Sequence, residues 1–242
     1  MRSVPARREP APLRSIEPPS LGHPLFLLNL KAYPNHLGEA AARIAQLLES
    51  LSHETGVACA IAPPLPDLAR VAGAVEIPVL SQHVDPGEAG ARTGFAPVEA
   101  IAAAGARGSL VNHSEHPMPI GDVEDAVRRL GAHRLVAVVC AADVPRARRL
   151  AETHPPYLAV EPPELIGGDR SVSTARPEVV SGTVEAVHSV SFSTRVLCGA
   201  GVHDRHDVAR AIELGAEGVL VASAVTRAPD SEKAIRELLA GY

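Results

Sequence analysis

The chain has 242 residues, of which 46% are hydrophobic and only 2% aromatic, and its formal net charge is -5. This length and composition allow one large domain with a core of Ala, Val, Leu and Ile. The mild acidic charge, without a basic block, argues against nucleic acid as a main partner. No apolar run is long enough for a signal peptide or a membrane span, so we expect a cytoplasmic protein without a membrane partner.

The first 22 residues predict a disordered extension that precedes a catalytic domain of residues 23–242. Five prolines and the arginines Arg2, Arg7 and Arg8 fall in this segment. Such a composition is typical of disordered chain, because it offers little apolar surface to bury.

Three cysteines, an odd number without a CxxC pair, each lie in an apolar run. We predict that Cys59, Cys140 and Cys198 are reduced, buried thiols, as is usual in the cytoplasm. Their role would then be to fill the core.

From Leu25 onward, short apolar runs alternate with longer helical patterns. The runs are nearly continuous in Val, Leu, Ile and Ala, which is typical of parallel strands covered on both faces. Helical patterns such as Glu39–Glu49 and Asp204–Leu214 lie between them, and several open with Asp or Pro and close with Gly. The predicted strands are Leu25–Lys31, Val57–Ala62, Ile77–Gln82, Gly108–Asn112, Arg134–Cys140, Tyr157–Glu161, Arg195–Gly199 and Gly218–Ala222.

Eight strand–helix units in succession predict a closed (β/α)8 barrel in a single domain. The alternative is a doubly wound open sheet, which would carry a glycine-rich turn after its first strand. The corresponding segment here, Asn29-Leu-Lys-Ala-Tyr-Pro34, contains no glycine. The barrel is therefore favoured.

Chemistry in such barrels gathers at the carboxyl ends of the strands. Lys31 stands out there because the chain has two lysines and 21 arginines, and a compact ammonium suits a site that holds one small oxyanion. The other strand ends supply the imidazole of His113 and the carboxylate of Glu161. The small residues that end strands seven and eight leave backbone N–H groups open to a phosphate. Together these groups predict proton abstraction beside a carbonyl, with the developing oxyanion held by the cation and the imidazole.

No metal and no cofactor are expected. His113 and His116, like His203 and His206, have the spacing of metal ligands on one helix face, but neither pair has a cysteine or a spaced third ligand nearby.

Five motifs fall in register at five strand ends: Asn29-x-Lys31, Asn112-His-Ser-Glu115, Glu161-Pro-Pro-Glu-Leu-Ile-Gly167, Cys198-Gly-Ala-Gly201 and Gly218-Val-Leu-Val-Ala-Ser223. In this order they resemble the triosephosphate isomerase family, in the compact, tryptophan-poor form typical of archaea. The resemblance runs from about Leu25 to the C-terminus. It implies interconversion of dihydroxyacetone phosphate and D-glyceraldehyde 3-phosphate, through an enediolate and without a cofactor.

The resemblance also implies a role for each matching residue. Glu161 would move the proton between the two substrate carbons, and His113 would be the neutral electrophile that polarises the carbonyl. Lys31 would be the cation beside the enediolate. Asn29 would help to hold the substrate.

Further residues would support this site. Glu115 would pair with Lys31, and Ser114 would contact Glu161 while a lid formed by Pro162–Ser173 is open. The phosphate would be held by the backbone N–H groups of four residues, Gly167 in the lid and Gly201, Ala222 and Ser223 at the ends of the last two strands.

The segment Asp85–Gly94 reaches into a neighbouring subunit in this family, with the residue that matches Thr93 near its active site. The resemblance therefore implies a homodimer or a homotetramer.

Some positions depart from the family pattern, namely Gly168-Asp169, His116-Pro117 and His203. They leave open an aldose–ketose isomerase for another phosphorylated sugar, or a paralogue that binds a phosphosugar without turnover. A Schiff-base aldolase is disfavoured, because Glu115 beside Lys31 would keep the lysine charged.

Overall fold

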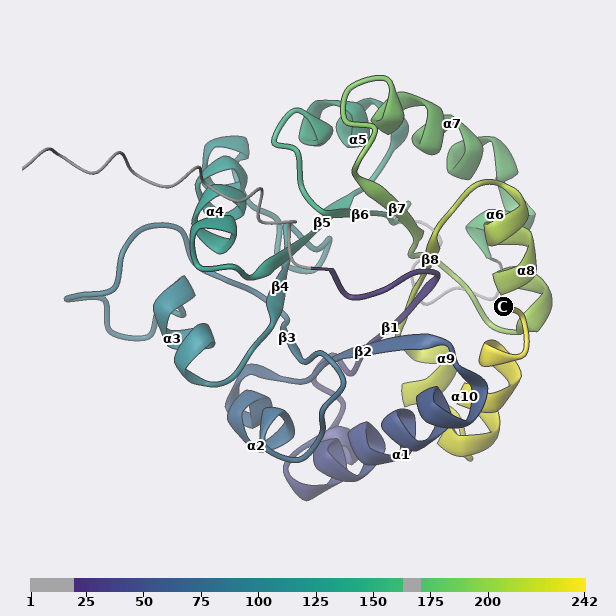
Figure 1. The fold of residues 1–242 in the computed structure, drawn as a ribbon, viewed down its shortest axis with the longest axis horizontal. Coiled ribbons are helices and arrows are strands. Elements are labelled where there is room, and N and C mark those ends of the chain that lie inside the picture. Colours follow the sequence, from purple (N-terminus) through teal and green to yellow (C-terminus); the bar gives the residue numbers. More distant parts are fainter. Residues whose placement is uncertain (1–19, 163–170) are drawn as a thin grey trace, which may run out of the picture.

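The computed structural model of the chain describes residues 20–162 and 171–242, which form a barrel of parallel strands ringed by helices (Figure 1). The strands pair in the order β2-β1-β8-β7-β6-β5-β4-β3, and a parallel bridge between Ile61 and Val79 joins β2 to the segment before β3. The predicted single-domain (β/α)8 barrel is confirmed. The strands are β1 (Leu25–Asn29), β2 (Ala58–Ala62), β3 (Leu80–Ser81), β4 (Gly108–Val111), β5 (Val136–Ala141), β6 (Tyr157–Val160), β7 (Arg195–Cys198) and β8 (Gly218–Val221).

The helices lie on the outside of this barrel (Figure 1), and their ends follow local signals in the sequence. Asp143, Asp204 and Asp230 accept backbone N–H groups at the starts of α5, α8 and α10, and Gly56 ends α1 in a left-handed conformation. The helices are α1 (Glu39–Thr55), α2 (Leu68–Ala72), α3 (Val98–Ala103), α4 (Ile120–Ala132), α5 (Val144–Ala151), α6 (Val172–Ala175), α7 (Pro177–His188), α8 (Arg205–Glu213), α9 (Ser223–Thr226) and α10 (Ser231–Leu239), with the 3-10 turns η1 (Pro34–His36) and η2 (Leu65–Asp67).

Two separate apolar clusters form the core. Phe26 and Leu28 of β1 belong to the cluster that includes the buried helix residues, whereas Leu25 and Leu27 belong to a cluster made almost entirely from strands. Because side chains alternate along a strand, the first cluster lies between barrel and helices and the second fills the barrel interior. The interior is therefore packed, and a ligand site must lie at one end of the barrel.

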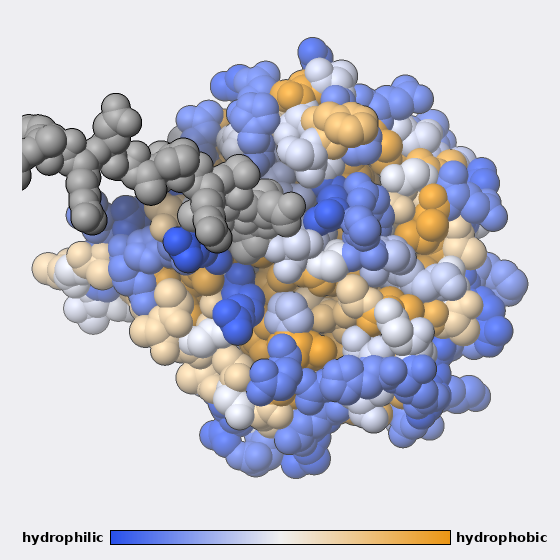
Figure 2. All heavy atoms as spheres, viewed as in Figure 1, coloured by the Kyte–Doolittle hydropathy of each residue, from blue (hydrophilic) through white to orange (hydrophobic). Residues whose placement is uncertain are grey.

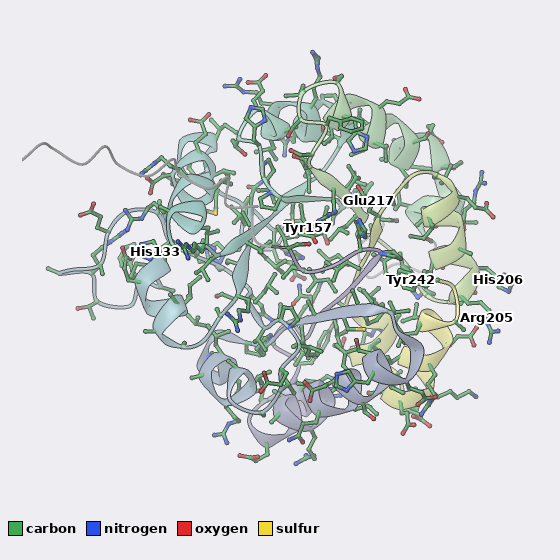
Figure 3. The ribbon with its side chains drawn as sticks, viewed as in Figure 1. His133, Tyr157, Arg205, His206, Glu217 and Tyr242 are labelled. Carbon is green, nitrogen blue, oxygen red and sulfur yellow. The ribbon has the colours of Figure 1, made fainter. Side chains whose placement is uncertain are left out.

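Residues that precede β1 close the amino-terminal mouth of the barrel. Leu21 is buried in the interior cluster, and its N–H donates to the hydroxyl of Tyr157, which itself donates to the carbonyl of Gly22 (3.0 and 2.9 Å). Arg195 lies over the Tyr157 ring and pairs with Glu217 at 3.4 Å. Figure 3 shows Tyr157 and Glu217 close together near the centre of the barrel. This leaves the carboxyl ends of the strands as the open end.

Hydrophilic residues cover much of the helical rim on the face drawn in Figure 2. Within residues 20–162 and 171–242, no helix is long and apolar enough to cross a membrane. Residues 1–19, which hold most of the predicted extension, lie outside the described part of the chain, so the boundary at residue 22 stays a prediction.

The predicted strands match the observed strands, but six of the eight extend too far at their carboxyl ends, whereas β2 ends at Ala62 as predicted and β5 continues one residue further, to Ala141. Lys31 and Asn112, both expected in strands, have φ angles of 50° and 61°, and this left-handed backbone ends a strand. The third strand covers only Leu80–Ser81 rather than Ile77–Gln82, with one isolated bridge at Val79 before it. The residues beyond the strand ends turn toward the open end of the barrel, where the candidate site lies.

Candidate active site

One cavity at the carboxyl ends of the strands collects most of the predicted site. It joins the ends of β1, β4, β6, β7 and β8, so the cation, the imidazole, the carboxylate and the small-residue turns lie together as the barrel model predicts. The predicted residues that line it are Asn29, Lys31, His113, Glu161, Gly201, Ala222 and Ser223.

The central pair of this cavity is His113 and Glu161, which are 6% and 3% exposed. Nε2 of His113 lies 3.6 Å from Oε1 of Glu161. On the other side of the ring, Nδ1 accepts a hydrogen bond from the backbone N–H of Glu115 at 3.1 Å. A nitrogen that accepts carries no proton, so this bond assigns a neutral imidazole whose Nε2–H points toward the cavity.

The environment of Glu161 favours its protonated form. Burial raises the pKa of this carboxyl above its ordinary value, while His113, Cys140 and Lys31 oppose the shift. A carboxylate with a raised pKa is a stronger base than a solvated one, and its conjugate acid can return the proton. These properties suit a group that must take up and release the same proton.

Lys31 supplies the cation through a tightly constrained turn. Its Nζ lies 2.7 Å from Oε1 of Glu115, and the two side chains are 14% and 57% exposed. Its backbone N–H donates to Oδ1 of Asn29 at 2.9 Å. Because Asn29 uses its amide oxygen in this way, its amide nitrogen is left to face the cavity.

The ends of β7 and β8 offer donors for an anion. Gly201 has a left-handed φ of 66°, and Ser223 is the first residue of α9. Among the described residues, neither backbone N–H donates to a protein acceptor. Donors of this kind, beside a small side chain, can approach a phosphate closely.

Three predicted site residues within the described ranges, Thr93, Ser114 and Glu115, do not line this cavity, although Glu115 pairs with Lys31 as predicted. Thr93 is exposed in the segment between β3 and α3, which projects away from the barrel (Figure 1). Ser114 does not contact Glu161 by a hydrogen bond: its Oγ and Oε2 of Glu161 are both buried without a partner among the described residues. Gly167 lies outside the described residues, as does Asp169, one of the positions that differ from the family pattern.

No catalytic or binding role is predicted from the sequence for three residues that the structure places at or beside the site. Cys140 is buried as predicted, but its thiol interacts with the carboxyl of Glu161, and burial raises its pKa well above the ordinary value. Gly199 lines the cavity beside Glu161. The amide of Gln82 bonds to Asn29 and to the backbone of Lys31. All three lie at the carboxyl end of a strand, which is the signal that would have found them.

Within the part of the chain that the structure describes, no group of three or more His, Cys, Asp or Glu side chains is arranged to hold a metal ion. His116 instead stacks on His83, with ring centroids 3.7 Å apart and planes 9° apart.

Comparison with known proteins agrees with this geometry. The family model described as triosephosphate isomerase matches residues 24–238. A curated protein named triosephosphate isomerase from Methanothermus fervidus is 46% identical over 219 residues, which cover 90% of this chain and 99% of that protein. Proteins of the same name from Methanosarcina acetivorans and Methanopyrus kandleri are 43% and 47% identical, again over 90% of this chain and over 99% and 97% of their own lengths. The chain therefore belongs to the triosephosphate isomerase family.

Proposed function

We propose that this chain, an aldose–ketose isomerase by its family, interconverts dihydroxyacetone phosphate and D-glyceraldehyde 3-phosphate by proton transfer through an enediolate. The observation that carries the mechanism is the pair of buried groups at the cavity wall, Glu161 and His113, 3.6 Å apart. One is a carboxylate that can take a proton from carbon. The other is a neutral imidazole whose Nε2–H can donate a hydrogen bond to a substrate oxygen.

The carbon proton moves through Glu161. Its carboxylate removes a proton from the hydroxymethyl carbon beside the ketone, and the electron pair of that C–H bond forms the carbon–carbon double bond of the enediolate. The carboxylic acid then returns the proton to the neighbouring carbon. The raised pKa of Glu161 supports both steps, because the same group must be a base in the first and an acid in the second.

The oxygen proton moves through His113. The former carbonyl oxygen becomes negative as the enediolate forms, and Nε2–H lies on the cavity side of the ring to donate to it. The hydroxyl oxygen on the other carbon loses its proton as the aldehyde forms. One proton thus passes between the two carbons and one between the two oxygens, so no oxidant or cofactor takes part.

Lys31 and the turns of small residues after β7 and β8 would hold the negative charges. The ammonium of Lys31 lines the same cavity as Glu161 and would stabilise the enediolate oxygens and the phosphate. The N–H groups of Gly201, Ala222 and Ser223 would bind the phosphate from the side of β7 and β8. A contact from Gly167 stays a prediction.

The direct test is the Glu161→Gln variant, assayed in both directions with the two triose phosphates. The amide cannot take the proton, so kcat should fall by about 10²–10⁴, and solvent deuterium should no longer enter the substrate carbon. Glu213→Gln, an exposed change on α8, is the matched control. Retained exchange in Glu161→Gln would exclude Glu161 as the base.

The same assays separate the alternatives. A parent protein that is inactive on triose phosphates but isomerises a longer ketose phosphate would be an isomerase for another sugar. A protein that binds the triose phosphates without turnover would be a binding paralogue.

We also propose that the chain forms a homodimer or homotetramer through the segment between β3 and α3. The shape of this segment is fixed from within: Asp85 accepts the N–H of Ala96 at 2.6 Å, and Asp125 of α4 accepts the N–H of Gly87 at 2.8 Å. Phe95 is nevertheless 50% exposed, so its ring is available for burial against a neighbouring subunit. The three free, buried cysteines suit the predicted cytoplasmic location.

A further inference from the structure

The side-chain amide of Gln82, just after β3, joins two strand ends of the barrel. Its Nε2 lies 3.1 Å from Oδ1 of Asn29, 3.0 Å from the carbonyl oxygen of Lys31 and 3.0 Å from that of Ala62. Two of these acceptors belong to the turn that carries the cation, and the third ends β2. Since an amide nitrogen has two hydrogens, the three acceptors share them.

The turn that Gln82 contacts is strained. Lys31 has a φ of 50°, a left-handed conformation that side chains other than glycine disfavour. Such strain persists where surrounding contacts over-determine the backbone. The bond from Gln82 is the one hydrogen bond that the carbonyl of Lys31 makes among the described residues.

The other two acceptors each have a second donor. Oδ1 of Asn29 also accepts the N–H of Lys31 at 2.9 Å, and the carbonyl of Ala62 also accepts the N–H of Leu30 at 3.0 Å. Loss of the Gln82 amide would therefore leave these two groups partnered. Its specific effect would fall on the backbone of Lys31.

Gln82 is not among the residues that line the cavity with Glu161; it lines a neighbouring cavity whose wall also includes Asn29, Lys31 and His113. Its amide nitrogen is nevertheless engaged by three protein acceptors, so it is not free to contact the reacting atoms. Any effect on the chemistry must pass through Asn29 and Lys31.

We propose that Gln82 is a positioning residue, whose amide holds Lys31 in its left-handed conformation and so fixes the ammonium beside the anionic intermediate. The inference rests on the role proposed above for Lys31. Without the amide, the backbone at position 31 relaxes toward ordinary φ angles. The Lys31 ammonium and the Asn29 amide are then no longer held in fixed positions relative to each other.

The first experiment compares Gln82→Met with Gln46→Met, a change of the chain's other glutamine on the exposed side of α1. Methionine keeps the length of the side chain but donates no hydrogen bond. We expect kcat to fall at least tenfold in Gln82→Met, with KM changed less than threefold, and both constants to stay within twofold in Gln46→Met. Gln82→Asn, which keeps an amide but shortens its reach, should behave like Gln82→Met. If both Gln82 variants keep kcat within twofold of the parent, the inference is wrong.

The second experiment separates positioning from a general effect on stability. Gln82→Met is combined with Lys31→Ala, and activity is measured with enzyme concentrations high enough to follow the slow variants. If Gln82 acts through Lys31, the added change lowers kcat less than twofold in the Lys31→Ala background. An equal loss in both backgrounds would show a merely structural role and overturn the inference. A Lys31→Ala variant with full activity would instead overturn the proposed role of Lys31 itself.

Discussion

A side chain at position 199 would collide with Glu161. A Cβ atom built on Gly199 lies 2.5 Å from Cγ of Glu161 and 3.1 Å from its Cδ. The register of the sheet explains this contact, because Val160 of β6 pairs with Cys198 of β7, so the residues that follow them lie side by side. The missing side chain at position 199 therefore leaves the space in which the carboxylate stands beside His113.

Gly199→Ala should consequently displace Glu161 while leaving the barrel folded. A displacement of the Glu161 carboxylate by up to about 1 Å is expected to lower kcat by about ten- to a hundredfold. Gly121→Ala is the control, because a Cβ at that position in α4 meets nothing within 4 Å and alanine favours a helix. Steady-state kinetics on both variants, with circular dichroism to check folding, test the effect. Equal activity of the two variants would contradict it.

Burial of Glu161 should also reduce the stability of the parent protein at neutral pH. Folding raises the pKa of the Glu161 carboxyl above the ordinary 4.5. Such a group contributes stability that is fully present below about pH 4.5 and is lost as pH rises through its pKa in the folded protein. Glu161→Gln removes that loss, because the amide is neutral at every pH. Its Tm should therefore exceed that of the parent near pH 7 and approach it below pH 4.5.

Thermal unfolding of the two proteins across this pH range checks the sign. For a domain of this size, about 1 kcal/mol corresponds to a Tm change of roughly 2–4 °C, which scanning calorimetry resolves. Glu213→Gln again serves as the exposed control. A Glu161→Gln protein that is less stable than the parent at pH 7 would show that the folded protein stabilises the ionised form of Glu161.

The sequence predicted the strands and the main site residues because both depend on local pattern. Continuous apolar runs require burial on both faces, and the polar residues that end such runs, Lys31, His113 and Glu161, must meet at one end of a parallel barrel. Contacts that depend on an unusual backbone angle are not visible in such a pattern. The hydrogen bond from Gln82 to the carbonyl of Lys31 forms because the backbone of residue 31 is left-handed. A lysine does not indicate such a backbone angle in the sequence.

Cys140 and the lid illustrate two further limits. An apolar run predicts that Cys140 is buried, which is confirmed, but not that its interior-facing register places the thiol against Glu161. The predicted roles of Gly167 and Asp169 fall outside the described residues and stay predictions.

Lys31 should require an ammonium group rather than positive charge alone. Its Nζ lies 2.7 Å from Glu115, with 14% of the side chain exposed, so a planar guanidinium has little space without entering the cavity. Lys31→Arg should lower kcat/KM by about 10²–10³, nearly as much as Lys31→Ala. Lys233→Arg, at the start of α10, is the matched control with the chain's other lysine.

Binding of a phosphoglycolate-like mimic of the enediolate gives the measurement that separates the two explanations. If Lys31→Arg binds the mimic as tightly as the parent does, the lysine contributes only long-range charge.

The stacked pair of His83 and His116 should make the protein less stable in mild acid. Burial, and then repulsion from His116, lower the pKa of His83 below its ordinary 6.5, while Asp85, 3.4 Å away, opposes the shift. As pH falls below about 6.5, the unfolded chain binds a proton that His83 in the folded chain resists. The free energy of unfolding should therefore fall through this range.

His83→Gln tests this expectation, because the amide does not titrate and still offers Asp85 a donor. Its stability should depend less on pH than that of the parent between about pH 7 and pH 5, measured by urea unfolding at several pH values. His206→Gln, at the outer surface of α8 (Figure 3), should keep the pH dependence of the parent. A His83→Gln protein that loses as much stability in acid as the parent would assign the acid sensitivity to other groups.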